Sequence, residues 1–80
     1  MSKAAPKQSR PDPWLSAVGE RLRIARKAAG LTQEQLAEAS ELAPRTIQKI
    51  EAGRITVLIT TLRRLRRALG CEFQELLPDD

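Results

Sequence analysis

One short helix predicted in the middle of the chain carries side chains that are able to recognise another molecule. Arg45, Gln48 and Lys49 share one face of this helix. The opposite edge is apolar and carries Ile47 and Ile50. Arginine offers a two-pronged donor that fits guanine, glutamine can pair with adenine, and lysine reaches guanine or phosphate. The same side chains are often only solvated on a surface helix, so the helix alone supports either interpretation.

The residue inventory excludes most other chemistry. The 80 residues include no histidine and no tyrosine, and Cys71 is the only cysteine. Most general-base chemistry therefore has no residue to perform it, and neither an internal disulfide nor a zinc site of several Cys or His residues can form. We expect no enzyme, no metal site and no cofactor. Cys71 is expected to be a small buried hydrophobic residue, and a redox role is the alternative.

Composition and charge indicate a small protein with a polyanionic partner. The chain is 41% hydrophobic and 30% charged, which suffices for one small core. No apolar run approaches the roughly 18 residues of a membrane span, and the first residues do not resemble a signal peptide, so we expect a soluble, cytoplasmic protein. The net charge of +4 falls in alternating blocks. The basic blocks, 14–30 and 43–70, could form one basic face, or they could be ordinary solvated surface.

The first element predicted is a long helix behind a polar arm. Residues 1–12 show no periodicity and predict a flexible basic arm ahead of a domain that spans residues 13–78. Asp12 followed by Pro13 is a typical helix start. Apolar residues then recur at helical spacing as far as Gly30, where the helix should end.

Two short helices follow. Thr32 and Gln35 form a capping box at the start of a helix that extends to about Ser40. Pro44 suits the first position of the next helix, which spans about residues 44–52 and ends near Gly53. Two short helices separated by three or four residues are typical of a helix-turn-helix.

The rest of the chain predicts two further helical segments. Residues 55–61 have strand propensity but no strand to pair with, so we expect an extended loop leading into a helix over 59–69 and a last turn over 73–77. The leucines of the 59–69 helix form its buried edge and leave four arginines outside: Arg63, Arg64, Arg66 and Arg67. The aromatic residues Trp14 and Phe73 lie at apolar positions and are expected in the core.

Several stretches together resemble the lambda-repressor-like, or XRE/Cro-type, helix-turn-helix family. They are Gly30–Glu38, Arg45–Gly53, Thr61–Leu65 and Ala68–Gly70, and the resemblance covers about residues 17–77. It implies a compact all-α domain of five helices. It also implies a transcriptional regulator, expected to be a repressor, that binds double-stranded operator DNA as a homodimer.

The resemblance also implies roles for individual residues. The third helix would enter the major groove, and Gln33 matches a residue that holds a phosphate where the positive end of a helix favours an anion. The complete set of implied DNA contacts is Thr32, Gln33, Pro44, Arg45, Thr46, Gln48, Lys49 and Arg54. Arg26 and Glu51 match a buried ion pair that joins the first and third helices. Two unlinked surface charges are the alternative.

The chain departs from the family pattern at the turn. Glu41 stands where glycine is usual, so a different turn geometry is expected. Ala43 stands where serine or threonine usually caps the recognition helix, which forgoes about 1 kcal/mol. Pro44 replaces a polar residue and could offer only an apolar contact, such as one to a thymine methyl group.

An apolar segment before the fourth helix replaces the polar loop usual in the family. Five residues there and in the last turn form a candidate dimer interface: Val57, Leu58, Ile59, Leu76 and Leu77. The alternatives are a docking patch for another protein, shared with Ile24, and a segment in which Ile55 and Val57 fold onto the core. Two such segments could also pair as strands across a dimer axis. The arginines of the fourth helix are expected near the DNA backbone or beside Asp79 and Asp80 of a partner subunit, or are simply solvated.

Overall fold

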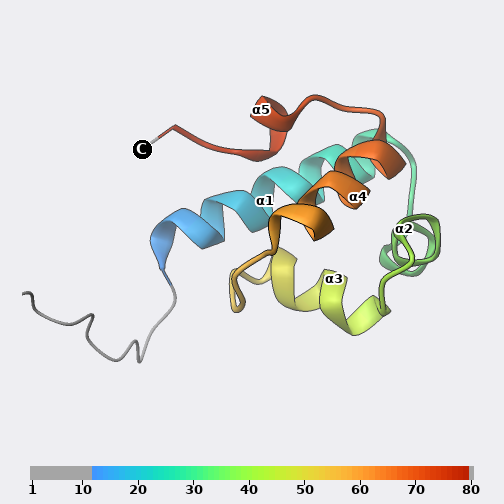
Figure 1. Ribbon diagram of the computed structural model, residues 1–80, viewed down its shortest axis with the longest axis horizontal. Coiled ribbons are helices and arrows are strands. Elements are labelled where there is room, and N and C mark those ends of the chain that lie inside the picture. The colour runs from blue at the N-terminus through green and yellow to red at the C-terminus, as the bar shows by residue number, and fades with distance from the viewer. Residues whose placement is uncertain (1–11, 80) are drawn as a thin grey trace, which may run out of the picture.

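The structure is a computed structural model that describes residues 12–79. This range contains five helices and no strand, as expected (Figure 1). The helices are α1 (Pro13–Ala28), α2 (Gln33–Ser40), α3 (Pro44–Glu51), α4 (Ile59–Leu69) and α5 (Phe73–Leu76). None of these helices is both long and apolar enough to cross a membrane. Residues 1–11 of the predicted arm and the acidic residue Asp80 lie outside the described residues.

The helices begin where the local sequence signals predicted. The Asp12 carboxylate accepts a hydrogen bond from the Trp14 backbone N–H at 2.9 Å, which caps α1. In the capping box of α2, the Thr32 hydroxyl accepts from the Gln35 N–H at 3.0 Å, and the Gln35 amide oxygen accepts from the Thr32 N–H at 2.9 Å. The α3 helix has Ala43 at its N-cap and no side-chain cap.

One backbone motif ends each of the four longer helices. A residue with a positive φ follows each helix, directly after α2 and α4 and one residue later after α1 and α3. The next N–H bonds back to a carbonyl five residues earlier, as Leu42 does to Ala37 at 2.8 Å. Glycine occupies the left-handed position after three of these helices, at Gly30, Gly53 and Gly70. After α2 the position is occupied by Glu41, with φ 60°. The expectation of a different turn geometry is therefore wrong: Glu41 adopts the conformation that glycine favours, and it does so at a steric cost.

The core lies between the five helices: α1 and α2 pack on the inner edge of α3, α4 packs on α2, and α5 packs on α1 and α4. Its buried side chains come from every helix and from the α4–α5 connection: Val18, Leu22, Leu36, Ala37, Ile47, Ile50, Leu65, Cys71 and Leu76. The α1 helix approaches α3 closely at Gly19, where an added Cβ would lie 2.3 Å from the Ile50 carbonyl oxygen. This approach brings Arg26 on α1 within reach of the end of α3.

The two aromatic side chains are not core residues, contrary to the sequence-based prediction. Trp14 and Phe73 are each 38% exposed. The Trp14 indole N–H donates to the Pro78 carbonyl at 3.2 Å, and an Arg21 guanidinium N–H donates to the Gln74 carbonyl at the same distance. These contacts hold the C-terminal segment along α1 and leave both aromatic rings at the surface.

The segment between α3 and α4 is extended, as predicted, and its side chains alternate. Ile55 and Val57 are half-buried and pack on the core, whereas Arg54, Thr56 and Leu58 are exposed. Alternation with period two is the geometry of an extended chain. It lets the β-branched residues Ile55 and Val57 pack on the core although the segment pairs with no other strand in the described residues.

Candidate nucleic-acid interface

The α2 and α3 helices form the helix-turn-helix (Figure 1). The inner edge of α3 is fully buried, because Ile47 and Ile50 have at most 2% of their surface exposed. The opposite face is exposed and carries most of the predicted base-contacting residues: Pro44, Arg45, Gln48 and Lys49. Thr46 is half-buried, and Arg54 is exposed just beyond the end of α3. The arrangement presents hydrogen-bond donors on one side of a helix whose other side is anchored in the core.

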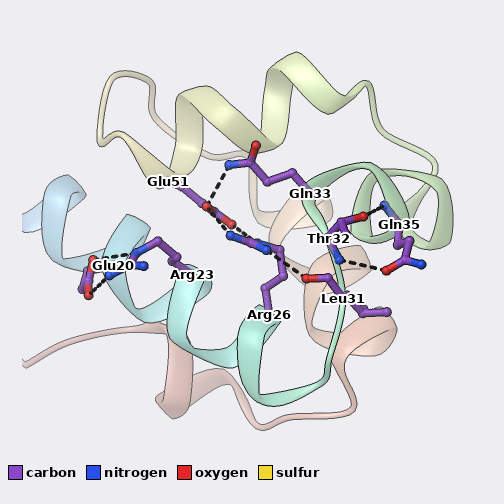
Figure 2. A network of polar contacts seen from close by, with 8 residues as sticks. All are labelled: Glu20, Arg23, Arg26, Leu31, Thr32, Gln33, Gln35 and Glu51. Carbon is purple, nitrogen blue, oxygen red and sulfur yellow. Dashed lines mark hydrogen bonds and ion pairs between the residues drawn. The ribbon is translucent and has the colours of Figure 1, made fainter.

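A polar network joins α1, α2 and α3 behind this face (Figure 2). Arg26 donates to both Glu51 carboxylate oxygens, from Nε at 2.6 Å and from Nη2 at 3.1 Å. Arg26 Nη1 also donates to the Leu31 carbonyl at 2.8 Å. Gln33 Nε2 donates to Glu51 Oε1 at 3.0 Å. The two charged side chains are 10% and 5% exposed, so they are two linked, buried charges rather than separate surface charges.

The first turn of α2 lies next to this network. Gln33 is its first residue and is half-buried. The Thr32 hydroxyl is engaged in the capping box. Within the described residues, the backbone N–H groups of Gln33 and Glu34 have no acceptor. Free N–H groups at the positive end of a helix dipole favour a bound anion such as a phosphate.

A second ion pair lies on the surface of α1. The Arg23 guanidinium lies 2.9 Å from Glu20, and the two side chains are about half exposed. The hydrogen bond from Arg23 lowers the pKa of Glu20, and the same bond and charge raise the pKa of Arg23. The Glu51 carboxylate also raises the pKa of Arg23, by less than Glu20 does. The sequence-based prediction did not include the Glu20–Arg23 pair, although a spacing of three residues on one helix indicates such a contact.

An apolar groove of about 410 Å³ opens on another side of the domain. Its lining is almost wholly apolar: Trp14, Leu15, Val18, Thr56, Val57, Ile59, Leu62, Phe73 and Leu77. Of the predicted interface residues, Ile59 and Leu58 are 80% and 69% exposed. Val57 and Leu77 are half-buried. Leu76 is fully buried and cannot contact a partner, which corrects its assignment to the interface.

Three of the four α4 arginines are exposed, as predicted, and one is not. Arg63, Arg64 and Arg67 lie on the surface. Arg66 is half-buried, donates to the Cys71 carbonyl at 3.1 Å, and lies 5.1 Å from the centre of the Phe73 ring. Arg66 therefore ties the end of α4 to α5 and is not a free surface charge.

The single cysteine is buried and unpaired. Burial raises the pKa of the Cys71 thiol, which keeps it protonated and unreactive. In the described part of the chain, no cluster of His, Cys, Asp and Glu side chains could hold a metal ion.

Comparison with known proteins identifies the family. A helix-turn-helix family model, HTH_3, matches residues 22–76. An uncharacterised HTH-type transcriptional regulator of Methanothermobacter thermautotrophicus is 43% identical over 54 residues, which cover 68% of this chain and 78% of that protein. The restriction-modification controller protein C.AhdI of Aeromonas hydrophila is 38% identical, with a TM-score of 0.76 over 79% of this chain and 96% of that one. The clp gene regulator ClgR of Corynebacterium glutamicum is 30% identical, with a TM-score of 0.75 over 86% of this chain and 94% of that one.

The family match spans more than half of the chain, and the five helices of the structure agree with it. The chain therefore belongs to the XRE/Cro-type helix-turn-helix family of DNA-binding transcriptional regulators and not to a class of enzymes.

Proposed function

We propose that this protein binds operator DNA sequence-specifically as a homodimer and represses transcription in the cytoplasm. The observation that supports this most strongly is the division of α3 into a fully buried apolar edge and an exposed polar face. A helix held this firmly can present Arg45, Gln48 and Lys49 to base edges in a fixed orientation.

The proposal divides the site into residues that read bases and residues that hold the backbone. Arg45, Gln48 and Lys49 contact bases, and Pro44 offers an apolar contact. The remaining residues of the site contact the phosphate backbone: Thr32, Gln33, Thr46 and Arg54. Backbone contacts fix the position of a protein on DNA but carry no direct sequence information.

Two substitutions test this division. Arg45→Ala should weaken operator binding by about 1–3 kcal/mol and relax the preference at one base pair in each half-site. Gln33→Ala should weaken binding to operator and to random-sequence DNA alike. Titrations of both variants against both duplexes measure this. If neither variant changed base preference and both lost affinity equally, the proposed orientation of α3 would be wrong.

The homodimer is supported by the apolar groove and its rim. Leu58 and Ile59 are more than two-thirds exposed beside a groove lined by Val57 and Leu77. Exposed apolar surface of this kind typically marks an interface. A two-fold dimer places its recognition helices about 34 Å apart, one turn of DNA, which gives the specificity that one small domain lacks.

The dimer is tested by charged substitutions at the rim. Leu58→Asp with Ile59→Asp should give a folded monomer, seen by sedimentation, that binds operator far more weakly. Ile24→Asp is the matched control, because Ile24 is 57% exposed on α1 and does not line the groove. A double variant that stays dimeric would place the interface elsewhere. A wild-type protein that is monomeric on its operator would favour the second candidate, a groove that binds another protein.

The physiological context is proposed from similarity alone. Phage repressors, restriction-modification controllers and antitoxins all include small proteins of this family. The similarity to C.AhdI, which covers 96% of that chain, favours a controller of a restriction-modification system. A methyltransferase or endonuclease gene beside this one would support that assignment, and an adjacent toxin gene would contradict it.

A further inference from the structure

We propose that Glu51 is a positioning residue for DNA binding, which orients the Gln33 amide so that it presents an N–H group to a phosphate. The proposal rests on the proposed function, in which Gln33 contacts the backbone. It assigns to the buried ion pair a role beyond joining α1 to α3.

The orientation of the Gln33 amide follows from the hydrogen bonds that the Glu51 carboxylate can make. An ionised carboxylate can only accept hydrogen bonds, whereas a glutamine amide can either donate or accept. Glu51 Oε1 accepts from Gln33 Nε2 at 3.0 Å, so the nitrogen faces the carboxylate and the carbonyl oxygen points away from it (Figure 2). A solvated glutamine has no such constraint and rotates freely.

The Glu51 carboxylate is itself fixed. Two bonds from Arg26 hold it, and its side chain is only 5% exposed. Arg26 also holds the Leu31 carbonyl, two residues before Gln33. Both the backbone that enters α2 and the first side chain of α2 are therefore tied to one ion pair.

This orientation suits a phosphate. The nitrogen of the Gln33 amide carries two hydrogens, and within the described residues only one of them has an acceptor. Phosphate oxygens accept hydrogen bonds, so the second hydrogen of this nitrogen is the one that can be donated to the DNA backbone. Arg26 neutralises the Glu51 charge, so the carboxylate can orient Gln33 without adding net negative charge beside the DNA.

The test replaces the ion pair by an apolar pair of similar size, Arg26→Met with Glu51→Leu. The exchange leaves the net charge unchanged, and such replacements often preserve folding. Its matched control is Glu20→Gln with Arg23→Gln, which removes the exposed ion pair of α1 and also leaves the net charge unchanged. Each protein is titrated with a short random-sequence duplex at fixed salt, with and without Gln33→Ala.

We expect the apolar pair to weaken binding to random DNA roughly two- to tenfold, the cost of ordering one free side chain on binding. Gln33→Ala should then have much less effect in the apolar-pair background than in the wild type. The control should bind like the wild type and respond fully to Gln33→Ala. Equal losses from Gln33→Ala in the wild type and the apolar-pair variant would overturn the proposal.

A measurement without DNA separates this proposal from the proposed function. The Gln33 side-chain amide signals in a ¹⁵N-edited NMR spectrum, identified by their loss in Gln33→Ala, should differ from those of exposed Gln48 and exchange more slowly with water. This test needs only the wild-type fold, so it stands even if the apolar pair does not fold. Gln33 signals that coincide with those of Gln48 would overturn the proposal even if the protein binds DNA. A protein with this signature that binds no DNA would instead overturn the proposed function, and with it the role of the Gln33–Glu51 bond in DNA binding.

Discussion

Removing the Arg26 side chain should cost this protein a large part of its free energy of unfolding. Arg26 makes three hydrogen bonds, two to Glu51 and one to Leu31. Arg26→Ala leaves the Glu51 carboxylate, which is only 5% exposed in the wild type, with Gln33 as its single donor. Leaving one member of a buried pair unpaired costs about 3–5 kcal/mol.

The cost of Arg26→Ala is large compared with the total free energy of unfolding. An 80-residue domain has a free energy of unfolding of roughly 4–12 kcal/mol, from about 0.05–0.15 kcal/mol per residue. With an m value of about 1 kcal/mol per molar urea, the unfolding midpoint should fall by about 3 M or more. Urea unfolding followed by far-ultraviolet circular dichroism measures this shift directly.

Two control variants show whether the loss of stability comes from leaving a buried charge unpaired. Arg67→Ala removes an exposed arginine that has no ion-pair partner in the described residues, and should change stability by less than about 0.5 kcal/mol. Arg26→Met with Glu51→Leu should recover most of the loss, because no charge is then left buried. A cost below about 1 kcal/mol for Arg26→Ala would refute the inference that the pair is buried and coupled.

Three further changes have expected outcomes. Glu41→Gly should raise the free energy of unfolding by about 0.5–1 kcal/mol, since the strain of a left-handed glutamate exceeds the added chain entropy of glycine; a lower melting temperature would contradict this. Gly19→Ala should lower the melting temperature despite the better helix propensity of alanine, because its Cβ would lie 2.3 Å from the Ile50 carbonyl oxygen; an unchanged value would show that α1 and α3 separate easily. Burial raises the pKa of Cys71, so the free energy of unfolding should be greatest below the ordinary pKa of a thiol and fall as the pH rises past it. For the same reason, native Cys71 should react slowly with a thiol reagent. Cys71→Ala should lack that part of the alkaline loss, and rapid labelling of the native protein would count against burial.

The elements that the sequence predicted well depend on interactions between near neighbours. Asp12 and Pro13 start α1, and Thr32 and Gln35 start α2, through contacts that reach no more than three residues along the chain. Gly70 ends α4 through bonds of similarly short range. Such signals act before any tertiary structure forms, which is why one sequence was enough to locate the helices.

The errors concern residues whose surroundings come from distant parts of the chain. Trp14 is at the surface, where its indole N–H bonds to the Pro78 carbonyl, 64 residues away. Arg66 bends toward the Cys71 carbonyl and the Phe73 ring, which no helical pattern within α4 indicates. Leu76 lies in a helix of four residues, too short for periodicity to decide which side faces the core.

The candidate site was predicted only in part, because one part of it depends on local spacing and another on distant residues. The exposed face of α3 follows from the spacing of Ile47 and Ile50 alone. The bond between Gln33 and Glu51 does not, because it requires the first residue of α2 and the last residue of α3 to meet. Helical spacing specifies which face of α3 is exposed, and tertiary packing specifies what supports it from behind.

Selection of bound duplexes from a random-sequence library, with wild-type protein and with Arg45→Ala, tests sequence-specific DNA binding most directly. We predict that the wild type enriches an inverted repeat whose half-site centres lie about 10 base pairs apart. Arg45→Ala should enrich the same repeat with one base pair of each half-site no longer specified. A wild-type selection that enriches no sequence over the starting library would contradict the account.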